Sequence, residues 1–400
     1  MSGVVVVGAG QAGASLVARL RSEGYEGPIT LIGEEPVPPY QRPPLSKKYL
    51  LGEMALERLY LRPESYYAEA GIDLRLGLRV TGIDRAAREV VMGAERLSYE
   101  HLVLATGSRP RHLPAAIGGD LGGVHVVRTL ADVDAMAPGF RPGAHVLIVG
   151  GGYIGLEAAA VAASRGMQVV LVEMAPRILQ RVAAKETSDY FRALHGRHGV
   201  DIRESVGLER LLGDGQVSGA RLSDGTELAV DMVIVGVGIV PDTALAEAAG
   251  LAIDNGITVD AQGRTSDPAI WAAGDCASFP HGEGRLRLES VPNAIDMADC
   301  VAGNILGRGV DYVPKPWFWS DQYDVKLQIA GLSNGYDRIV TRDGGAAVSF
   351  WYYRNDQLLA VDAMNDPRAY MVGKRLIDAG KSADPAVVAD AGADLKVLLG

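Results

Sequence analysis

Cysteine is scarce in this chain of 400 residues, which contains only Cys276 and Cys300 and no C-x-x-C or similar close pair. Enzymes that reduce disulfides need two nearby thiols or one reactive thiol, so their usual signature is missing. Both cysteines are expected to be small packed residues. His195 and His198 have no neighbouring thiols or paired acids, so the pattern predicts a solvated helix end and no metal site.

Long apolar runs and an excess of positive charge are also lacking. The valine run at residues 4–7 stops at Gly8, and no stretch reaches the roughly 18 apolar residues of a membrane span. The net charge of −10 argues against wide contact with nucleic acid or an anionic membrane, since excess Lys and Arg hold such surfaces. We therefore expect a cytoplasmic enzyme with no nucleic-acid or membrane partner.

Glycine is abundant, at 50 residues, and it gathers at turns that follow apolar runs. Two of these turns, "VGAGQAG" and "VGGGYIG", have the G-x-G-x-x-G spacing. The first glycine of this pattern makes a strand-to-helix corner, the second lets the backbone approach a phosphate, and the third lets helix and strand pack closely. The glycines at these positions are Gly8, Gly10 and Gly13, and then Gly150, Gly152 and Gly155.

The surroundings of the two turns repeat as well. Each turn opens a helical stretch that closes at a glycine, Gly24 or Gly166, at the same spacing. Each helical stretch leads to a second apolar run that ends in a carboxylate, Glu34 or Glu173, close to the offset of about 20 residues for an acid that holds an adenosine ribose. Two complete units of this kind predict two dinucleotide sites.

The order of these patterns predicts an α/β fold with two interleaved doubly wound (Rossmann-like) nucleotide-binding domains and a mixed α/β C-terminal domain. The first domain is predicted to be discontinuous, at residues 1–110 and 239–315, and the second to occupy residues 111–238. From residue 316, apolar runs with period 2 or unbroken runs between turn residues indicate an antiparallel sheet, and two helical stretches follow.

An ordered set of segments carries a family resemblance: "VVVVGAGQAG", "YQRPPLSKKYL", "LVLATGSRPR", "VLIVGGGYIGLE", "VIVGVGIVPD", "IWAAGDCA", "ESVPNA" and "PWFWSDQYD". The chain resembles the FAD-dependent pyridine-nucleotide oxidoreductases. It is more closely similar to the NADH-dependent ferredoxin reductases of bacterial P450 and Rieske oxygenase systems, the putidaredoxin reductase type. "PPLSK" and "FWSDQY" are the specific pieces, whereas the glycine turns are shared by the wider superfamily.

This resemblance implies a glutathione-reductase-like architecture, a bound FAD, NADH as substrate and an acidic [2Fe-2S] ferredoxin that docks transiently on a monomer. A flavin can take two electrons from NADH and give them up one at a time. One alternative is a reductase or oxidase of a small acceptor such as a quinone, an ascorbyl radical or oxygen. Another is a redox-controlled binding protein of the apoptosis-inducing-factor type, which would call for a basic surface that this acidic chain does not have.

The resemblance also implies roles for individual residues. Lys47 would lie beside the reactive edge of the flavin, Glu157 could pair with Lys47, Tyr153 could cover the flavin until nicotinamide displaces it, and Trp319 would cover the ring near the docking surface. The residues expected to bind FAD are Gly8, Gly10, Ala12, Gly13, Glu34 (or Glu35), Arg42, Lys47, Val80, Ala105, Gly107, Arg128, Gly274, Asp275 and Val291. The residues expected to bind NADH are Gly150, Gly152, Ile154, Gly155, Glu173 and Gly238, with Arg177 as a possible attraction for NADPH.

Overall fold

The computed structural model describes residues 3–399. The chain forms two compact units, each assembled from separate stretches of sequence. Unit 1 contains residues 3–42, 55–109 and 239–315, and unit 2 contains residues 43–54, 110–238 and 316–399. The predicted division into three domains stays a prediction.

Unit 1 is built on a parallel sheet whose central strand, β1 (Gly3–Val7), is buried along its whole length. A strand buried on both faces reads as a continuous apolar run, which explains the four valines. The strands lie in the order β3 (Ile72–Arg75), β2 (Ile29–Ile32), β1 and β6 (Glu95–Leu104), with β18 (Ile270–Ala272) parallel to the end of β6. The start of β6 pairs instead with the antiparallel strands β5 (Glu89–Met92) and β4 (Gly82–Asp84).

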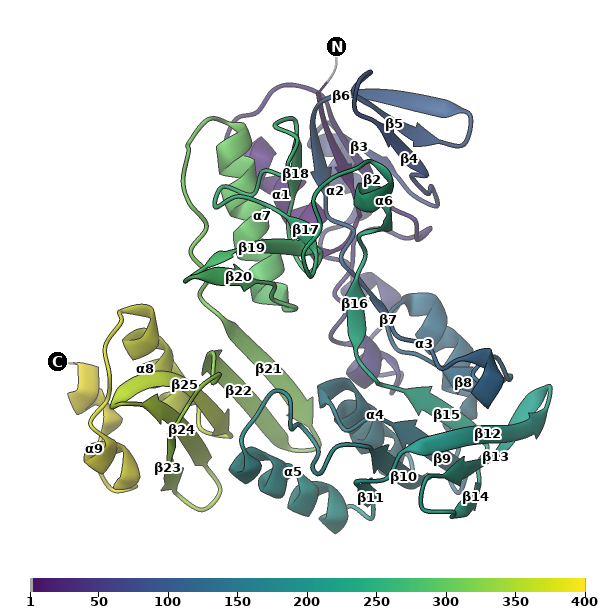
Figure 1. Ribbon diagram of the computed structural model, residues 1–400, viewed down its shortest axis with the longest axis vertical. Helices are drawn as coiled ribbons and strands as arrows, with labels where there is room; N and C mark the ends of the chain where they lie inside the picture. Colours follow the sequence, from purple (N-terminus) through teal and green to yellow (C-terminus); the bar gives the residue numbers. More distant parts are fainter. Residues whose placement is uncertain (1–2, 400) are drawn as a thin grey trace. The chain divides into compact units, whose positions relative to one another are not determined.

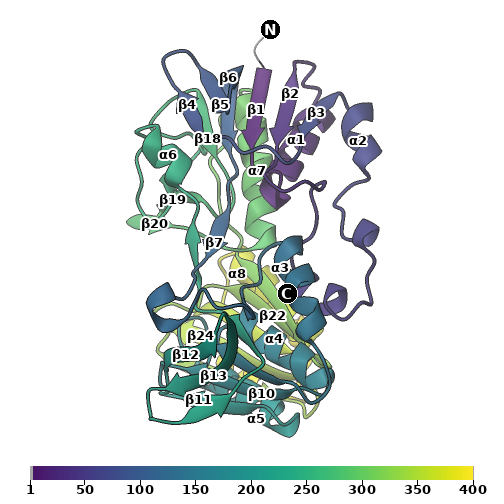
Figure 2. The ribbon, with the colours of Figure 1, turned by 90° about the vertical axis from the view of Figure 1, so that its right-hand side faces the viewer.

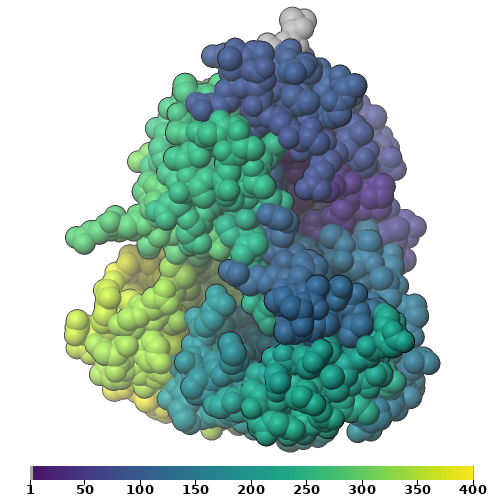
Figure 3. All heavy atoms as spheres, turned by 45° about the vertical axis from the view of Figure 1, so that its right-hand side comes forward, coloured from purple at the N-terminus to yellow at the C-terminus, as the bar shows by residue number. Residues whose placement is uncertain are grey.

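Two helices cover this sheet side by side, α1 (Gln11–Ser22) and α7 (Val291–Ile305), as Figures 1 and 2 show. The smaller elements of unit 1 are η2 (Leu56–Arg58), α2 (Glu64–Glu69), α6 (Ala244–Ala248), and the sheet β17 (Ile257–Thr258), β19 (Ala277–His281) and β20 (Gly284–Leu286). The exposed hairpin between β19 and β20 projects from the surface of unit 1 (Figure 3). The strands β7 (Ser108–Pro110) and β16 (Ile239–Pro241) pair where the chain passes between the units.

Unit 2 repeats the parallel architecture. Its five strands lie in the order β11 (Asp201–Glu204), β10 (Gln168–Glu173), β9 (His145–Val149), β15 (Met232–Val235) and β8 (Val124–His125). The accompanying elements are η1 (Leu45–Tyr49), η3 (Ala115–Ile117), α3 (Leu130–Met136), η4 (Ala137–Gly139), α4 (Tyr153–Ser164), α5 (Lys185–Arg197), and the antiparallel strands β12 (Leu208–Asp214), β13 (Gln216–Leu222) and β14 (Glu227–Ala229).

The C-terminal part of unit 2 is the expected antiparallel sheet followed by helices. Its strands lie in the order β21 (Trp317–Gln322), β22 (Val325–Gly331), β25 (Gln357–Met364), β24 (Val348–Arg354) and β23 (Arg338–Asp343). The helices are α8 (Pro367–Asp378), α9 (Pro385–Ala389) and η5 (Leu395–Leu399). The predicted fold class, two doubly wound α/β regions with a mixed C-terminal region, is confirmed.

No helix within the described part of the chain is long and apolar enough to cross a membrane. One local expectation is wrong, because His195 does not lie at a solvated helix end. It is fully buried on the inner face of α5 and hydrogen-bonded to Gln322 of β21, while His198 beyond the helix is exposed.

Candidate active site

The first glycine turn joins β1 to α1 and leaves the start of the helix open. Gly8 has a φ of 115°, and a Cβ there would collide with the carbonyl oxygen of Ala105. Gly10 is the N-cap of α1, and among residues 3–399 no side chain caps it. A Cβ on Gly10 would meet nothing within 4 Å. The turn therefore presents free backbone N–H groups and the positive end of the helix dipole to open space, which suits an anion.

The second glycine turn has the same geometry in unit 2. Gly150 has a φ of 107°, and a Cβ there would meet the carbonyl of Gly236. Gly152 is the N-cap of α4, again without a side-chain cap in the described structure and with open space where a Cβ would lie. The exposed Ile154 follows it on the first turn of the helix. Each of the two units thus presents an open helix N-terminus that suits an anion.

The two carboxylates at the ends of the second strands are not equivalent in register. Val7 pairs with Ile32 and Val149 pairs with Val172, so Glu173 corresponds to Gly33, and Glu34 lies one residue further along. Glu173 accepts hydrogen bonds from the N–H groups of Gly151 and Ala175, both at 2.7 Å. It therefore ties the end of β10 to the glycine turn that precedes α4.

The neighbouring acids Glu34 and Glu35 bind different partners. Glu34 is exposed and forms an ion pair with Arg79 at 3.2 Å. Glu35 accepts from Arg42 at 2.7 Å and from the hydroxyl of Tyr40 at 2.6 Å. Glu34 is thus positioned at the surface of unit 1, whereas Glu35 fixes the guanidinium of Arg42.

Asp275 is the next candidate residue of unit 1. The Ser108 hydroxyl donates to its carboxylate at 2.9 Å. Gly274, just before it, has a φ of 83°, and its Cα approaches Ala12 of α1 so closely that a Cβ would lie 3.0 Å from the methyl group of Ala12. Val291 begins α7, where the Ser290 side chain is the N-cap and accepts from the N–H of Asn293.

The remaining residues predicted to bind a cofactor lie in unit 1, in unit 2 and in the segments that connect the two units. Ala105 is buried beside the first glycine turn, and Val80 is partly buried against the core of unit 1. Gly107 and Gly238 have positive φ values of 70° and 98° where the chain passes between the units. Arg128 lies in unit 2, where its backbone N–H donates to Asp132 at 3.1 Å.

The partly buried Lys47 and the buried Glu157 form an ion pair inside unit 2, with Lys47 Nζ 2.9 Å from Glu157 Oε2. Lys47 lies in η1, where its backbone leaves the helical conformation (φ −136°, ψ −111°), and Glu157 lies on the inner side of α4. The Ser46 hydroxyl donates to Glu157 Oε2 at 2.9 Å, and the Ser320 hydroxyl donates to Glu157 Oε1 at 2.7 Å. The suggested pairing of Lys47 with Glu157 is therefore present.

Aromatic side chains lie on both faces of β21, the strand that carries Ser320. Tyr153, at the start of α4, packs its ring against Phe318 at 4.9 Å between centroids. Burial raises the pKa of the Tyr153 phenol well above its ordinary value, and the hydroxyl has no hydrogen-bond partner in the described structure. Trp317 and Trp319 lie together on the face of β21 opposite to Phe318, with ring centroids 5.5 Å apart. This confirms the alternation expected from the sequence.

Sequence reasoning missed the polar residues that surround Glu157. Ser46, Ser320 and Gln322 are almost completely buried. Their signal was present, because Ser46 belongs to "PPLSK", and Ser320 and Gln322 alternate in "FWSDQY". Period-2 alternation would have placed these last two on the face of β21 away from the tryptophans.

In the described structure the two thiols contact backbone carbonyls and Asn304, and neither contacts Lys47 or Glu157. Cys276 is fully buried, burial raises the pKa of its thiol, and its Sγ lies against the carbonyl oxygen of Leu104 at 3.4 Å. Burial also raises the pKa of Cys300, and both cysteines are free. Within residues 3–399 no cluster of His, Cys, Asp or Glu could hold a metal ion.

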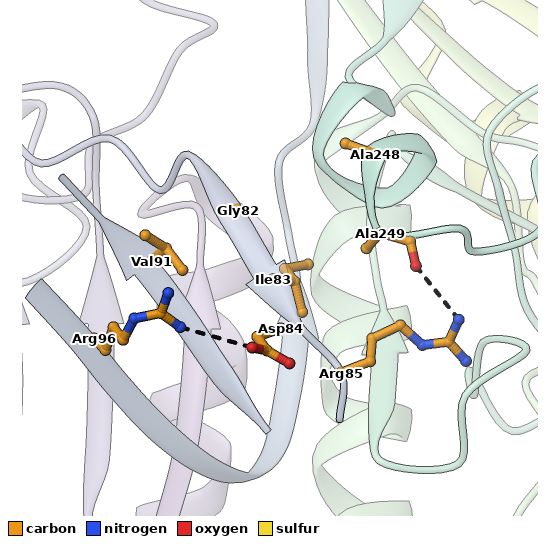
Figure 4. A pocket seen from close by; sticks show the side chains of 8 residues that line it. All are labelled: Gly82, Ile83, Asp84, Arg85, Val91, Arg96, Ala248 and Ala249. Atoms are coloured by element: carbon orange, nitrogen blue, oxygen red, sulfur yellow. Dashed lines mark hydrogen bonds and ion pairs between the residues drawn. The ribbon is translucent and has the colours of Figure 1, made fainter. Parts of the chain in front are cut away.

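A surface hollow elsewhere in unit 1 does not compete with this site. Its charged groups are already engaged, since Arg96 lies 3.7 Å from Asp84 and Arg85 donates to the carbonyl of Ala249 (Figure 4). Its lining residues are Gly82, Ile83, Asp84, Arg85, Val91, Arg96, Ala248 and Ala249, none of which was predicted to bind a cofactor.

The residues of both turns fit the pyrophosphate of a dinucleotide such as FAD or NADH. In each turn the second glycine leaves open space beside an uncapped helix N-terminus, which any Cβ would enter. Anions bind at such helix ends through free N–H groups and the helix dipole.

Comparison with known proteins agrees with this geometry. Residues 2–298 match the pyridine nucleotide-disulphide oxidoreductase family, and residues 317–399 match the reductase C-terminal family. The chain is 44% identical over 390 residues to a ferredoxin–NAD(P)(+) reductase of Sphingomonas sp, covering 96% of this chain and 94% of the relative. It is 41% identical to putidaredoxin reductase of Pseudomonas putida, covering 99% and 96% of the two chains.

Solved structures give the same result. The reductase in the covalent putidaredoxin reductase–putidaredoxin complex superposes with a TM-score of 0.96 at 40% identity, covering 100% of this chain and 98% of that one. The ferredoxin reductase for the CYP199A2 system of Rhodopseudomonas palustris superposes with a TM-score of 0.95 at 40% identity, covering 99% of both. The chain therefore belongs to the pyridine nucleotide-disulphide oxidoreductase family, as the sequence motifs predicted.

Proposed function

We propose that the protein is an NADH-dependent ferredoxin reductase that holds FAD and passes electrons one at a time to an acidic [2Fe-2S] ferredoxin of a P450 or Rieske oxygenase system. One observation carries the proposal: two separate units present open helix N-termini after glycine turns, while both cysteines are free, with Cys276 buried and Cys300 partly buried. The names of the relatives, which are ferredoxin reductases at 41–44% identity, support the choice of acceptor.

The first turn would keep FAD and the second would exchange NADH. In unit 1, Gly10 at the start of α1 would face the FAD pyrophosphate, and Asp275 would accept a hydrogen bond from the ribityl chain. Glu34, or Glu35 with its partner Arg42, would serve the adenosine end. In unit 2, Gly152 would face the NADH pyrophosphate.

The bound flavin would supply the change from two-electron to one-electron transfer. The contribution of the chain is to position and neutralise. Lys47 and Glu157 neutralise each other. An unpaired charge left in a buried place would cost about 3–5 kcal/mol. A fixed, neutral pair of this kind suits the nicotinamide side of the site.

Tyr153 is suited to move when nicotinamide binds. Its buried hydroxyl has no partner among the described residues, and leaving such a group unsatisfied costs about 1–3 kcal/mol. A rotation of the ring away from Phe318 would release that cost and open space above α4. The tyrosine would therefore act as a cover that the incoming nucleotide displaces.

The face of β21 that carries Trp317 and Trp319 is the proposed side for the ferredoxin, with Trp319 covering the flavin near the docked partner. Both tryptophans are partly exposed and stack near one another. Large aromatic side chains of this kind are common at the energetic centre of protein interfaces.

The direct test is purification and turnover. The protein should be yellow, carry one non-covalent FAD as a monomer, and reduce cytochrome c in the presence of NADH only when a [2Fe-2S] ferredoxin is added. Quinones, an ascorbyl radical source and oxygen serve as competing acceptors in the same assay. If a small acceptor is reduced faster than every ferredoxin tested, the protein is a reductase of small molecules instead.

A further inference from the structure

A line of buried polar side chains leads away from the Lys47–Glu157 pair, entirely within unit 2. Ser320 Oγ lies 2.7 Å from Glu157 Oε1, and Gln322 Nε2 lies 3.1 Å from Ser320 Oγ. Gln322 Oε1 lies 2.8 Å from His195 Nε2, and the Tyr323 hydroxyl lies 3.2 Å from His195 Nδ1. Four hydrogen bonds thus connect the carboxylate on α4 to the β21–β22 turn.

The direction of every bond in this line follows from one fact, which is that a carboxylate only accepts. Ser320 must therefore give its single proton to Glu157, so its oxygen accepts from the amide of Gln322. The Gln322 carbonyl oxygen then faces His195 and needs a donor, so His195 carries its proton on Nε2. Nδ1 is left as the acceptor for the Tyr323 hydroxyl.

The line is protected from solvent along most of its length. Ser320, Gln322 and His195 are each no more than 1% exposed. Hydrogen bonds in a dry interior strengthen one another when all of them point the same way, and a break in such a network is costly. Figure 1 shows how α5, which carries His195, lies beside the end of β21 that carries Gln322.

The line ends at Tyr323, a residue type that is not favoured at its position in the β21–β22 turn. Tyr323 is the first of the two residues that connect β21 to β22, and its φ is 55°. Glycine or asparagine is preferred at such a position. The tyrosine side chain instead donates to His195, and its ring stacks on the exposed His198 with 3.6 Å between centroids.

We propose that Ser320, Gln322 and His195 form a one-way hydrogen-bonded chain that holds the Glu157 carboxylate oriented towards Lys47, which makes these three residues positioning residues for the nicotinamide side of the site. This inference rests on the proposed role of the Lys47–Glu157 pair. The amide of Gln322 interrupts any simple proton path, so the chain fixes an orientation and does not conduct protons.

The chain keeps its direction over the usual working range of pH. Burial is the main reason that the pKa of His195 is lowered to about 4, with the neighbouring His198 contributing in the same direction. The groups that face the ring are Gln322 and Tyr323, and burial raises the pKa of Tyr323 beyond the range where it would lose its proton. Neutral His195 and protonated Tyr323 are therefore the forms present near pH 7.

The first test observes the chain without any turnover. In protein labelled with ¹⁵N-histidine, with His195 assigned by its loss in His195→Gln, the wild type should show the Nε2–H tautomer. Glu157→Gln replaces the acceptor with a side chain that can donate to Ser320, which allows every bond to reverse. The His195 signal should then shift towards the Nδ1–H tautomer, at the far end of the chain.

The second test separates positioning from packing. Gln322→Met keeps the volume of the side chain but removes the amide, and Ser320→Ala removes the hydroxyl. Each should slow NADH-dependent flavin reduction about five- to twentyfold while the KM for NADH stays within about twofold. Ser349→Ala is the matched control, since Ser349 is equally buried in β24 of the same sheet but bonds to Asp366 and not to Glu157.

The effect of Gln322→Met should disappear when Glu157 has already been changed to Gln, because the chain then has no carboxylate to hold. An Nδ1–H tautomer in the wild type, a tautomer that does not respond to Glu157→Gln, or equal losses in Gln322→Met and Ser349→Ala would each overturn the inference. If the protein shows no NADH-dependent reduction, the proposed function fails, while the tautomer still decides whether the chain exists.

Discussion

At the scale of single residues, Glu173 is a carboxylate whose partners in the chain are backbone N–H groups of its own unit. It accepts from Gly151 and Ala175, and these bonds hold its carboxylate beside the second glycine turn. Arg177, the possible attraction for a 2′-phosphate, is engaged elsewhere, since it donates to the carbonyl of Ala184 and the hydroxyl of Ser188. A negative charge without a free positive neighbour favours a ribose hydroxyl over a phosphate.

We therefore expect kcat/KM to be at least about tenfold higher with NADH than with NADPH, which corresponds to about 1.4 kcal/mol. Glu173→Gln removes the charge and should reduce this preference to about threefold, chiefly through better use of NADPH. Glu209→Gln, at an exposed position on β12, makes the same change and should leave the ratio alone. Equal efficiency of the wild type with both coenzymes would contradict the assignment of Glu173.

His195 gives a second prediction at this scale, on stability. Its pKa is lowered by burial from about 6.5 in the unfolded chain to about 4, so the unfolded state binds a proton first as the pH falls. Stability is therefore full above about pH 6.5 and declines towards pH 4, by about 2–3 kcal/mol at pH 4.5.

This decline should be smaller in His195→Gln when urea midpoints are compared at pH 7 and pH 4.5. The comparison with the variant is needed because Asp362 has the opposite effect. Burial raises the pKa of this carboxyl, which accepts from Tyr352 and Thr187, to about 6, so its contribution to stability grows as the pH falls. Identical pH dependence in the variant and the wild type would show that His195 is not held neutral.

At the scale of elements, the two strand–turn–helix units were predictable because their signal is local. The apolar run, the glycine spacing and the helix that closes at Gly24 or Gly166 all lie within one short stretch, and the structure has them where the sequence indicated. The alternation in β21 was predictable for the same reason. The two nucleotide cofactors followed from the two units, and the family followed from these turns together with specific segments such as "PPLSK" and "FWSDQY".

The polar interior of unit 2 was not predictable, because its partners are far apart in sequence. His195 looked like part of a solvated helix end, since Gly196 and Gly199 follow it and Arg192 and Arg197 lie close on either side. Its burial arises only when β21 packs on α5 and brings Gln322 to it. In the same way, nothing local to Glu34 shows that β2 and β10 end in different register.

The two turns make a prediction that separates their roles. Gly10 and Gly152 each have open space where a Cβ would lie, so alanine at either position should fold but obstruct the approach of a pyrophosphate. Gly10→Ala should lose FAD at least about tenfold more readily than the wild type. Gly152→Ala should retain FAD and raise the KM for NADH by a similar factor.

Retention of FAD can be measured by fluorescence of the released flavin after dilution, and NADH use by ferricyanide turnover. Gly284→Ala is the control, since a Cβ there also meets nothing within 4 Å but lies in the β20 strand, away from both turns. Loss of FAD in Gly152→Ala, or retention of FAD in Gly10→Ala, would contradict the assignment of FAD to the first turn and NADH to the second.

At the scale of the whole molecule, the net negative charge of the chain opposes the binding of an acidic ferredoxin. The chain has a net charge of −10, so an acidic ferredoxin is repelled overall and needs a local positive surface. Of the basic residues near the tryptophan segment, Arg308 is already paired with Glu23. Lys326 is exposed and lies opposite Asp321 in the β21–β22 register, which places it on the same face as Trp319.

Docking held by so few charges should be sensitive to salt, because exposed charges are screened beyond a Debye length of about 10 Å at 0.1 M. We expect higher ionic strength to reduce ferredoxin-coupled turnover several-fold more than NADH-to-ferricyanide turnover, which needs no docking. Lys326→Gln should lower the coupled rate at low salt and flatten its salt dependence, and Trp319→Ala should slow the coupled rate selectively. Lys381→Gln, the same change at an exposed position beyond α8, is the control. If both activities respond alike to salt and to these variants, electrons leave the protein without a docked partner, and a small acceptor explains the site better.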